Sequence, residues 1–148
     1  MHNPMFKHFD IMVFDKEDLP VLVANVIRVH PFDKSRGLFY YQEVNKYAKR
    51  IGVEYVLIVA PSKMQLWSLS NDDILAEFDT ATALAPYIGK EFTVEKVSKH
   101  YLKISVLIWL DNLVYPWKKS EVPCQEELEA LGVLEQIEKG QVEFEVKE

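Results

Sequence analysis

The feature that most constrains the fold is a nearly unbroken apolar run, Val53 to Ala60, that directly follows an amphipathic segment. A short apolar run bounded by turn signals is typical of a β-strand buried on both faces. In the segment before it, Leu38 to Ile51, apolar residues recur every three or four positions and Gly52 follows, which indicates a helix and its end. With the β-branched run Pro20 to Val29 ahead of the helix, the pattern predicts a βαβ crossover.

The segments around this crossover predict a mixed sheet. We expect a first strand, Phe9 to Phe14, to form a hairpin with the run Pro20 to Val29 through the turn Asp15 to Asp18. After the crossover the pattern predicts a strand, a polar turn and a short helix capped by Asp79, which are Met64 to Leu69, Ser70 to Asp73 and Thr80 to Tyr87.

The C-terminal half predicts a long helix, a second helix and a last strand. Helical spacing of apolar residues extends from Val94 to about Tyr115, with Thr93 as a possible cap and Pro116 as the end. A helix from Gln125 to Glu138 and a turn at Lys139 and Gly140 should follow. The last element is an alternating strand, Gln141 to Val146, with Val142, Phe144 and Val146 on one face.

The stretch Ile104 to Leu110 is apolar around most of its helical circumference. It is far shorter than the ~20 residues that span a bilayer, so we expect no membrane segment there. It must be covered on more than one side, either by the sheet and another helix or by a second subunit. A homodimer is therefore expected.

Length and composition point to one globular domain over residues 1–148, with 49% hydrophobic and 27% charged residues, and the order of the expected elements makes it α/β. The net charge of −6 opposes tight non-specific binding to a phosphate backbone.

Cys124 is the only cysteine, which excludes an internal disulfide and a cysteine zinc cluster and fits a reducing compartment. The start of the sequence lacks the apolar core of a secretory signal, so we expect a cytoplasmic protein.

Three segments carry a resemblance to a known superfamily. They are "FDIMVFDKEDLPVLVANVIRV", "QEVNKYAKRIGVEYVLIVAPSKMQLWSL" and "ELEALGVLEQIEKGQVEFEV". In this order they resemble the hairpin, helix, central strands and tail of the restriction-endonuclease-like, or PD-(D/E)xK, nucleases, and in particular small cyanobacterial-type proteins of that fold. The resemblance implies a restriction-endonuclease-like mixed central sheet flanked by helices, with a long helix in the C-terminal half.

The catalytic residues that the resemblance implies are degenerate. The family uses an Asp at the first strand and an acidic-x-Lys element on the second, which hold Mg²⁺ and activate water. Asp10 takes the place of the first Asp, with a vestigial metal role or only a hydrogen-bonding role at a strand end. Asn25 stands in place of the acid and Ile27 in place of the lysine, so a ligand charge and a cationic donor are both missing.

Two helix residues could replace the missing groups by migration. Glu43 follows the second strand, and Gln42 resembles the glutamine that some family members use there, with Arg28 or Lys46 as a source of positive charge. The alternative is that these residues are only the solvated face of an amphipathic helix, which comprises Gln42, Glu43, Lys46 and Arg50.

A basic cluster is the best candidate for contacting an anion or a nucleic-acid strand, although surface solvation explains it equally well. It comprises Arg28, His30, Lys34 and Arg36. Aromatic clusters such as Phe39-Tyr40-Tyr41 are interpreted mainly as core or interface packing, with base stacking as the alternative. The four histidines are scattered, and the glycine-rich and hydrolase motifs of nucleotide, serine and zinc enzymes do not occur.

Three functional hypotheses follow from the sequence. The first is a catalytically inactive nuclease-fold protein that acts by binding, without a cofactor and as a homodimer or beside a protein partner. The second is a residual Mg²⁺-dependent nuclease built on Asp10 and Glu43. The third is a protein-interaction domain with no affinity for nucleic acid.

Overall fold

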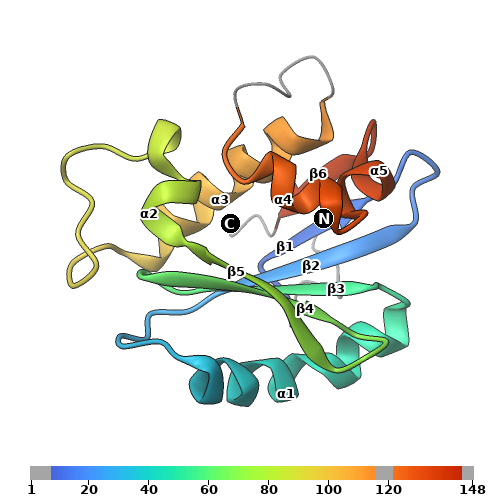
Figure 1. Ribbon diagram of the computed structural model, residues 1–148, viewed down its shortest axis with the longest axis horizontal. Coiled ribbons are helices and arrows are strands. Elements are labelled where there is room, and N and C mark those ends of the chain that lie inside the picture. Colours follow the sequence, from blue (N-terminus) through green and yellow to red (C-terminus); the bar gives the residue numbers. More distant parts are fainter. Residues whose placement is uncertain (1–7, 116–121, 145–148) are drawn as a thin grey trace.

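The computed structural model describes residues 8–115 and 122–144, which form an α/β fold with a six-stranded mixed sheet flanked by helices. The sheet order is β5-β4-β3-β2-β1-β6. Helix α1, Lys34–Ile51, is the only described helix on one face, and all the others cover the opposite face (Figure 1). The strands are β1 Ile11–Phe14, β2 Pro20–Val26, β3 Tyr55–Val59, β4 Lys63–Ser68, β5 Asp73–Asp79 and β6 Gln141–Phe144.

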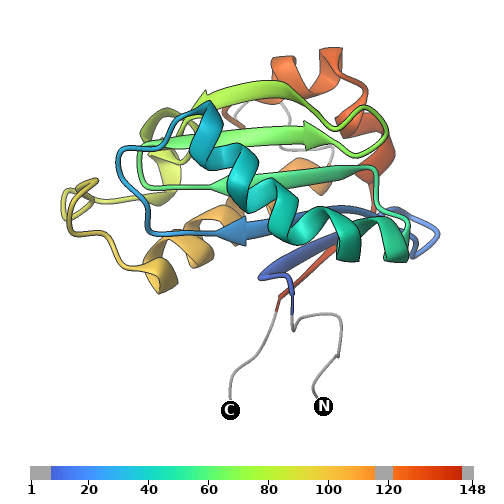
Figure 2. The same ribbon diagram turned by 90° about the horizontal axis from the view of Figure 1, so that it is seen from below.

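The predicted topology of the first half is confirmed. β1 and β2 pair antiparallel as a hairpin, and β2 pairs parallel with β3 through the α1 crossover. β3 and β4 then pair antiparallel. β3 is buried along its whole length, as the apolar run predicted. α1 lies diagonally across its face of the sheet in Figure 2.

Helix α1 begins one turn before the predicted start at Leu38, because Asp33 caps it. The Asp33 side chain accepts a hydrogen bond from the Arg36 backbone N–H, which supplies one of the partners that a helix N-terminus lacks. Gly37 lies inside the helix. A Cβ there would collide with the Gln65 side chain, so glycine lets α1 approach β4.

Two strand predictions need correction. The strand predicted to reach Val29 ends at Val26, and the chain then leaves the sheet toward α1. β5 was not predicted at all, because its half-exposed residues do not alternate clearly between apolar and polar. It is an edge strand that pairs with β4, and Asp79 at its end caps the short helix α2, Thr80–Ala83, as predicted. The helix predicted to reach Tyr87 ends at Ala83, and a separate 3-10 helix, η2 Ala85–Tyr87, follows it.

The long helix α3, Lys99–Val114, is shorter at its start than predicted. Ser98, and not Thr93, is its N-cap, and the Ser98 hydroxyl accepts from the Tyr101 N–H. Thr93 instead closes a separate turn, with its side chain and carbonyl accepting from Lys96 and Val97. The helix ends at Val114, and Pro116 lies outside the described residues.

The helix predicted from Gln125 to Glu138 is two short helices, α4 Gln125–Ala130 and α5 Val133–Ile137. Gly132 separates them with a φ of +78°, a conformation that glycine adopts without steric cost. A turn at Lys139 and Gly140 then leads into β6, as predicted, while the predicted end at Val146 lies outside the described residues.

The core has two apolar clusters, one on each face of the sheet. The larger contains α3 and the inner sides of α2, α4 and α5, and the smaller lies beneath α1. The stretch around Ile104 to Leu110 is therefore covered by the sheet and by other helices on most of its surface, with Ile104 and Ile108 left exposed. Among the described residues, no helix combines the length and the hydropathy that crossing a membrane requires.

Candidate functional site

Asp10 and Asn25 meet where β1 begins and β2 ends, and each side chain binds the other residue's strand. The Asp10 backbone N–H donates to Asn25 Oδ1 at 2.9 Å, and the Val26 N–H donates to Asp10 Oδ2 at 2.8 Å. Asn25 Nδ2 donates to the His8 carbonyl at 2.9 Å. We call Asp10 and Asn25 with these bonds the strand-end clamp.

The clamp forms because β2 continues for two residues beyond the last position at which it pairs with β1. The last paired residues on this side are Ile11 and Ala24, so the Val26 N–H faces a position where β1 supplies no carbonyl. A partly buried N–H without an acceptor costs on the order of 1–3 kcal/mol. The Asp10 carboxylate takes the place of the absent carbonyl, which gives this residue a structural task.

Lys99, the first residue of α3, lies beside the clamp. Its Nζ is 3.4 Å from Asp10 Oδ1. The Lys99 side chain is 53% exposed and that of Asp10 is 15% exposed, so the pair contributes no more than about 1 kcal/mol. Both Asp10 oxygens thus have partners, one a backbone N–H and the other an ammonium.

The clamp is a poor place for a divalent cation. Mg²⁺ takes several oxygen ligands, usually including one or two carboxylates, whereas this site offers a single carboxylate with a neighbouring cation. Within residues 8–115 and 122–144, no group of three or more His, Cys, Asp or Glu side chains could hold a metal. Ile27 packs against the apolar cluster beneath α1 and offers no donor.

The migrated candidates lie elsewhere. Gln42 and Glu43 are exposed on α1, and no hydrogen bond or ion pair joins either to Asp10 or Asn25. The structure therefore brings together Asp10 and Asn25 from the sequence candidates, adds Lys99, and leaves the two helix residues on a solvent-facing surface.

The predicted basic cluster lies around the start of α1. Arg28 and His30 are exposed on the loop after β2, and Lys34 and Arg36 are exposed in the first turn of the helix. Arg36 Nη1 donates to the Pro31 carbonyl at 2.7 Å, which holds the guanidinium against the loop. Beside it is an open hollow of about 370 Å³, lined by Val29, Ser35, Arg36, Phe39 and Tyr40.

Basic and aromatic side chains continue along α1. The helix carries five basic residues and one acidic residue, a net charge of +4, so the rest of the chain, with twelve basic and twenty-two acidic residues, carries −10. Phe39 is 56% exposed. Farther along, Tyr47 stacks on His8 with ring centroids 3.6 Å apart, and Lys46 Nζ and Arg50 Cζ lie 5.1 and 5.8 Å from the Tyr47 ring centroid.

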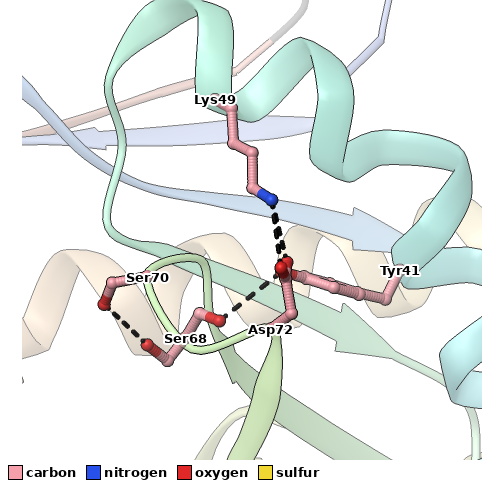
Figure 3. A network of polar contacts seen from close by, with 5 residues as sticks. All are labelled: Tyr41, Lys49, Ser68, Ser70 and Asp72. Atoms are coloured by element: carbon pink, nitrogen blue, oxygen red, sulfur yellow. Dashed lines mark hydrogen bonds and ion pairs between the residues drawn. The ribbon is translucent and has the colours of Figure 1, made fainter.

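A second polar network ties α1 to the turn between β4 and β5 (Figure 3). The Tyr41 hydroxyl donates to Asp72 at 2.5 Å, and Lys49 Nζ lies 3.0 Å from the same carboxylate. The hydrogen bond from Tyr41 and the Lys49 ammonium lower the pKa of Asp72. Burial and the adjacent Asp72 raise the pKa of Tyr41, so this hydroxyl stays protonated. The network fastens a turn and leaves no group poised for chemistry.

Cys124 is half-buried and unpaired among the described cysteines, as a single cysteine must be. Burial, followed by the charges of Glu127 and Asp79, raises the pKa of its thiol to about 11. Since the thiolate is the reactive form, this cysteine is unreactive at neutral pH.

Sequence reasoning missed Lys99 and the pair Tyr41 and Asp72. Each depends on a contact between residues far apart in the chain, and neither residue of such a pair stands out in its local pattern. The reciprocal hydrogen bonds of Asp10 and Asn25 were not predicted. Comparisons with protein-family models, curated proteins and solved structures find no match for this chain.

Proposed function

We propose that this chain is a catalytically inactive relative of the PD-(D/E)xK nucleases that acts by binding a polyanion, and that α1 with the loop before it is the binding surface. The observation that carries the first part is the strand-end clamp. The Asp10 carboxylate, the one acid retained at the motif positions, is occupied by the Val26 N–H and Lys99.

The chemistry that phosphodiester hydrolysis requires is absent from the motif positions. Asn25 provides no charge, and its oxygen already accepts from the Asp10 N–H. Ile27 can neither donate a hydrogen bond nor balance a developing oxyanion. Loss of one preorganised donor alone costs about 10²–10³ in rate, and loss of a ligand charge adds to this.

The binding part of the proposal rests on the separation of charge in the molecule. A net charge of +4 on α1, in a chain of −6, creates a local positive field that a phosphate backbone would enter. Phe39 and Tyr40 lie beside Arg36 at the hollow, where aromatic faces can stack on unpaired bases. Basic residues that follow a backbone next to aromatic rings are typical of single-stranded nucleic-acid sites.

The catalytic part is tested by incubating the protein with single- and double-stranded DNA and RNA in Mg²⁺ or Mn²⁺. We expect no metal-dependent cutting. Cutting that is lost in Asp10→Asn would overturn the proposal, because this variant removes the carboxylate charge while leaving an oxygen that can accept from Val26 N–H.

The binding part is tested by fluorescence anisotropy with a labelled single-stranded oligonucleotide at several salt concentrations. We expect Lys46→Ala/Arg50→Ala to weaken binding and to reduce the slope of log K against log salt by about 0.7 for each phosphate that the variant no longer neutralises. Lys90→Ala/Lys96→Ala is the matched control, because both residues are exposed and lie outside α1. Binding that is absent, or equally weakened in the control, would support a protein-interaction domain without nucleic-acid affinity instead.

One observation favours the second candidate, a rearranged Mg²⁺-dependent nuclease. Lys99 supplies an ammonium beside Asp10, the kind of group that Ile27 lacks. Activity of this type would be lost in Lys99→Ala as well as in Asp10→Asn. Under the first proposal the wild-type protein does not cut nucleic acid, so neither variant should change the result.

A further inference from the structure

Helix α3 leaves one strip of its surface only partly covered by the sheet and the neighbouring helices. The strip consists of His100, Ile104, Leu107 and Asp111, which are spaced by four, three and four residues and so lie on one side of a helix. His100 and Ile104 are exposed, and Leu107 and Asp111 are half-buried. We call these four residues the α3 strip.

The apolar part of this surface extends beyond the strip. Ile104 is 37% exposed, and Ile108, which borders the strip, is 42% exposed. Phe144, on the edge strand β6 that packs against α3, is 41% exposed. Half of the six large hydrophobic residues exposed in the described part of the chain therefore belong to this pair of elements.

The charges of α3 are reversed relative to its dipole. Lys99 and His100 lie in the first turn, where the helix end is partly positive, and Asp111 lies in the last turn, where it is partly negative. Such a placement is unfavourable for a charged group at low salt. Lys99 is offset by Asp10. Among the described residues, no ion pair or hydrogen bond offsets His100 or Asp111.

Two copies of the α3 strip are complementary when they run in opposite directions, because each residue then lies opposite a residue of matching chemistry. When a second α3 runs antiparallel to the first, His100 lies opposite Asp111 and Ile104 lies opposite Leu107, and the two-fold axis repeats both pairs. The imidazole N–H can donate to the carboxylate, the apolar residues meet in the centre, and the two helix dipoles oppose each other.

We infer that the α3 strip is a homodimer interface in which two copies of α3 pack antiparallel. The occupant is a second copy of this chain because one strip supplies both members of each pair, so no other partner is required. The interface is on the opposite face of the sheet from α1, and it stands independently of polyanion binding.

The first test is the molar mass measured by light scattering and sedimentation over a range of protein concentrations. We expect a dimer for the wild-type protein and a monomer for Ile104→Lys. Leu38→Lys is the matched control, because Leu38 is 39% exposed on α1, and it should remain dimeric. A monomeric wild-type protein, or a dimer that survives Ile104→Lys, would overturn the inference.

The second test distinguishes an antiparallel from a parallel arrangement. His100→Asp and Asp111→Lys should each weaken the dimer by about tenfold, since two unfavourable charge pairs, related by the two-fold axis, replace two favourable ones. The double variant His100→Asp/Asp111→Lys should restore it, because each helix then presents Asp opposite Lys. A parallel dimer aligns like residues, so the double variant would not be restored.

His100→Asp also separates the interface from folding. An acid in the first turn of α3 complements the helix dipole, so the thermal stability of the monomer should hold or rise while the dimer weakens. If His100→Asp lowered both the thermal stability of the monomer and the strength of the dimer, the inference would be contradicted, because His100 would then stabilise the fold of the single chain.

Discussion

Helices α1 and α3 are similar in length, 18 and 16 residues, and pack on opposite faces of one sheet, yet they expose different surfaces. No other helix in the described part of the chain lies on the α1 face of the sheet, so only four of its residues are buried, and its broad outer face carries most of its basic and aromatic side chains. α3 is enclosed by the sheet and by other helices, so seven of its residues are buried, and its exposed residues are Lys99, His100, Ile104 and Ile108.

The difference shows how tertiary neighbours select the surface that a helix offers. A helix covered on one side keeps a wide polar face, which suits a charged ligand. A helix covered on several sides must be apolar around most of its circumference, and the part that emerges suits a protein surface. The two proposed interfaces therefore differ in chemistry because the two layers differ in how many helices they contain.

The largest expected effect compares the two cores through their buried tryptophans. Trp67, beneath α1, and Trp109, on α3, are 2% and 1% exposed. Substitution of either by Ala should lower the free energy of unfolding by about 3–5 kcal/mol, through lost burial and an unfilled cavity. Guanidinium denaturation followed by circular dichroism measures this. A loss below about 1 kcal/mol at Trp67 would mean that the single-helix layer contributes little to stability.

An intermediate effect is expected at Gly37, where α1 approaches β4. The Gln65 side chain that a Cβ would meet is fully buried and bound to Asp33 and Trp67, so it cannot easily move. Gly37→Ala should cost about 1–3 kcal/mol of unfolding free energy by overpacking. Gly89→Ala is the control, because its Cβ would meet only the exposed Glu91 carboxylate. Equal stability of the two variants would show that the close approach is not constraining.

The smallest expected effect concerns the network that ties α1 to the β4–β5 turn. Tyr41→Phe should cost about 1 kcal/mol at neutral pH, since Asp72 is 52% exposed and its hydrogen bond is partly replaced by water. Tyr40→Phe, at a half-exposed residue, is the control and should cost less.

The cost of Tyr41→Phe should depend on pH in a defined window. The lowered pKa of Asp72 stabilises the fold above its ordinary value of 3.8, and this is lost as pH falls through the lowered value. The raised pKa of Tyr41 stabilises the fold below its ordinary value of 10.0, and this is lost as pH rises beyond it. Denaturation midpoints of the two proteins should differ most between these limits, and a constant difference would contradict the linkage.

Much of the fold could be predicted from local periodicity. The hairpin, the α1 crossover, the fully buried β3 and the Asp79 cap all follow from residues close together in the sequence. The errors occurred where a competing local feature decided the outcome. Ser98 replaced Thr93 as a cap, and Gly132 divided a predicted helix. β5 was not predicted because an edge strand with half-exposed residues shows only a weak alternation of apolar and polar residues.

The candidate site could be predicted only in part. That Asp10 and Asn25 converge follows from their places on paired strands, but the hydrogen bonds that occupy them depend on where β1 starts relative to β2. Lys99 reaches Asp10 only because α3 crosses the sheet at that point. The basic residues of α1 were visible in the sequence, while the openness of the face that carries them was not.

The sequence by itself determined most of the helices and strands, the charge of α1 and the absence of an acid and a lysine at positions 25 and 27, because each of these is a property of neighbouring residues or of side-chain type. The tertiary structure alone decided which polar groups are occupied and which surfaces stay open. The physical reason is that hydrogen bonds, ion pairs and burial depend on distances between segments remote in the chain, and these distances are fixed only when the layers pack.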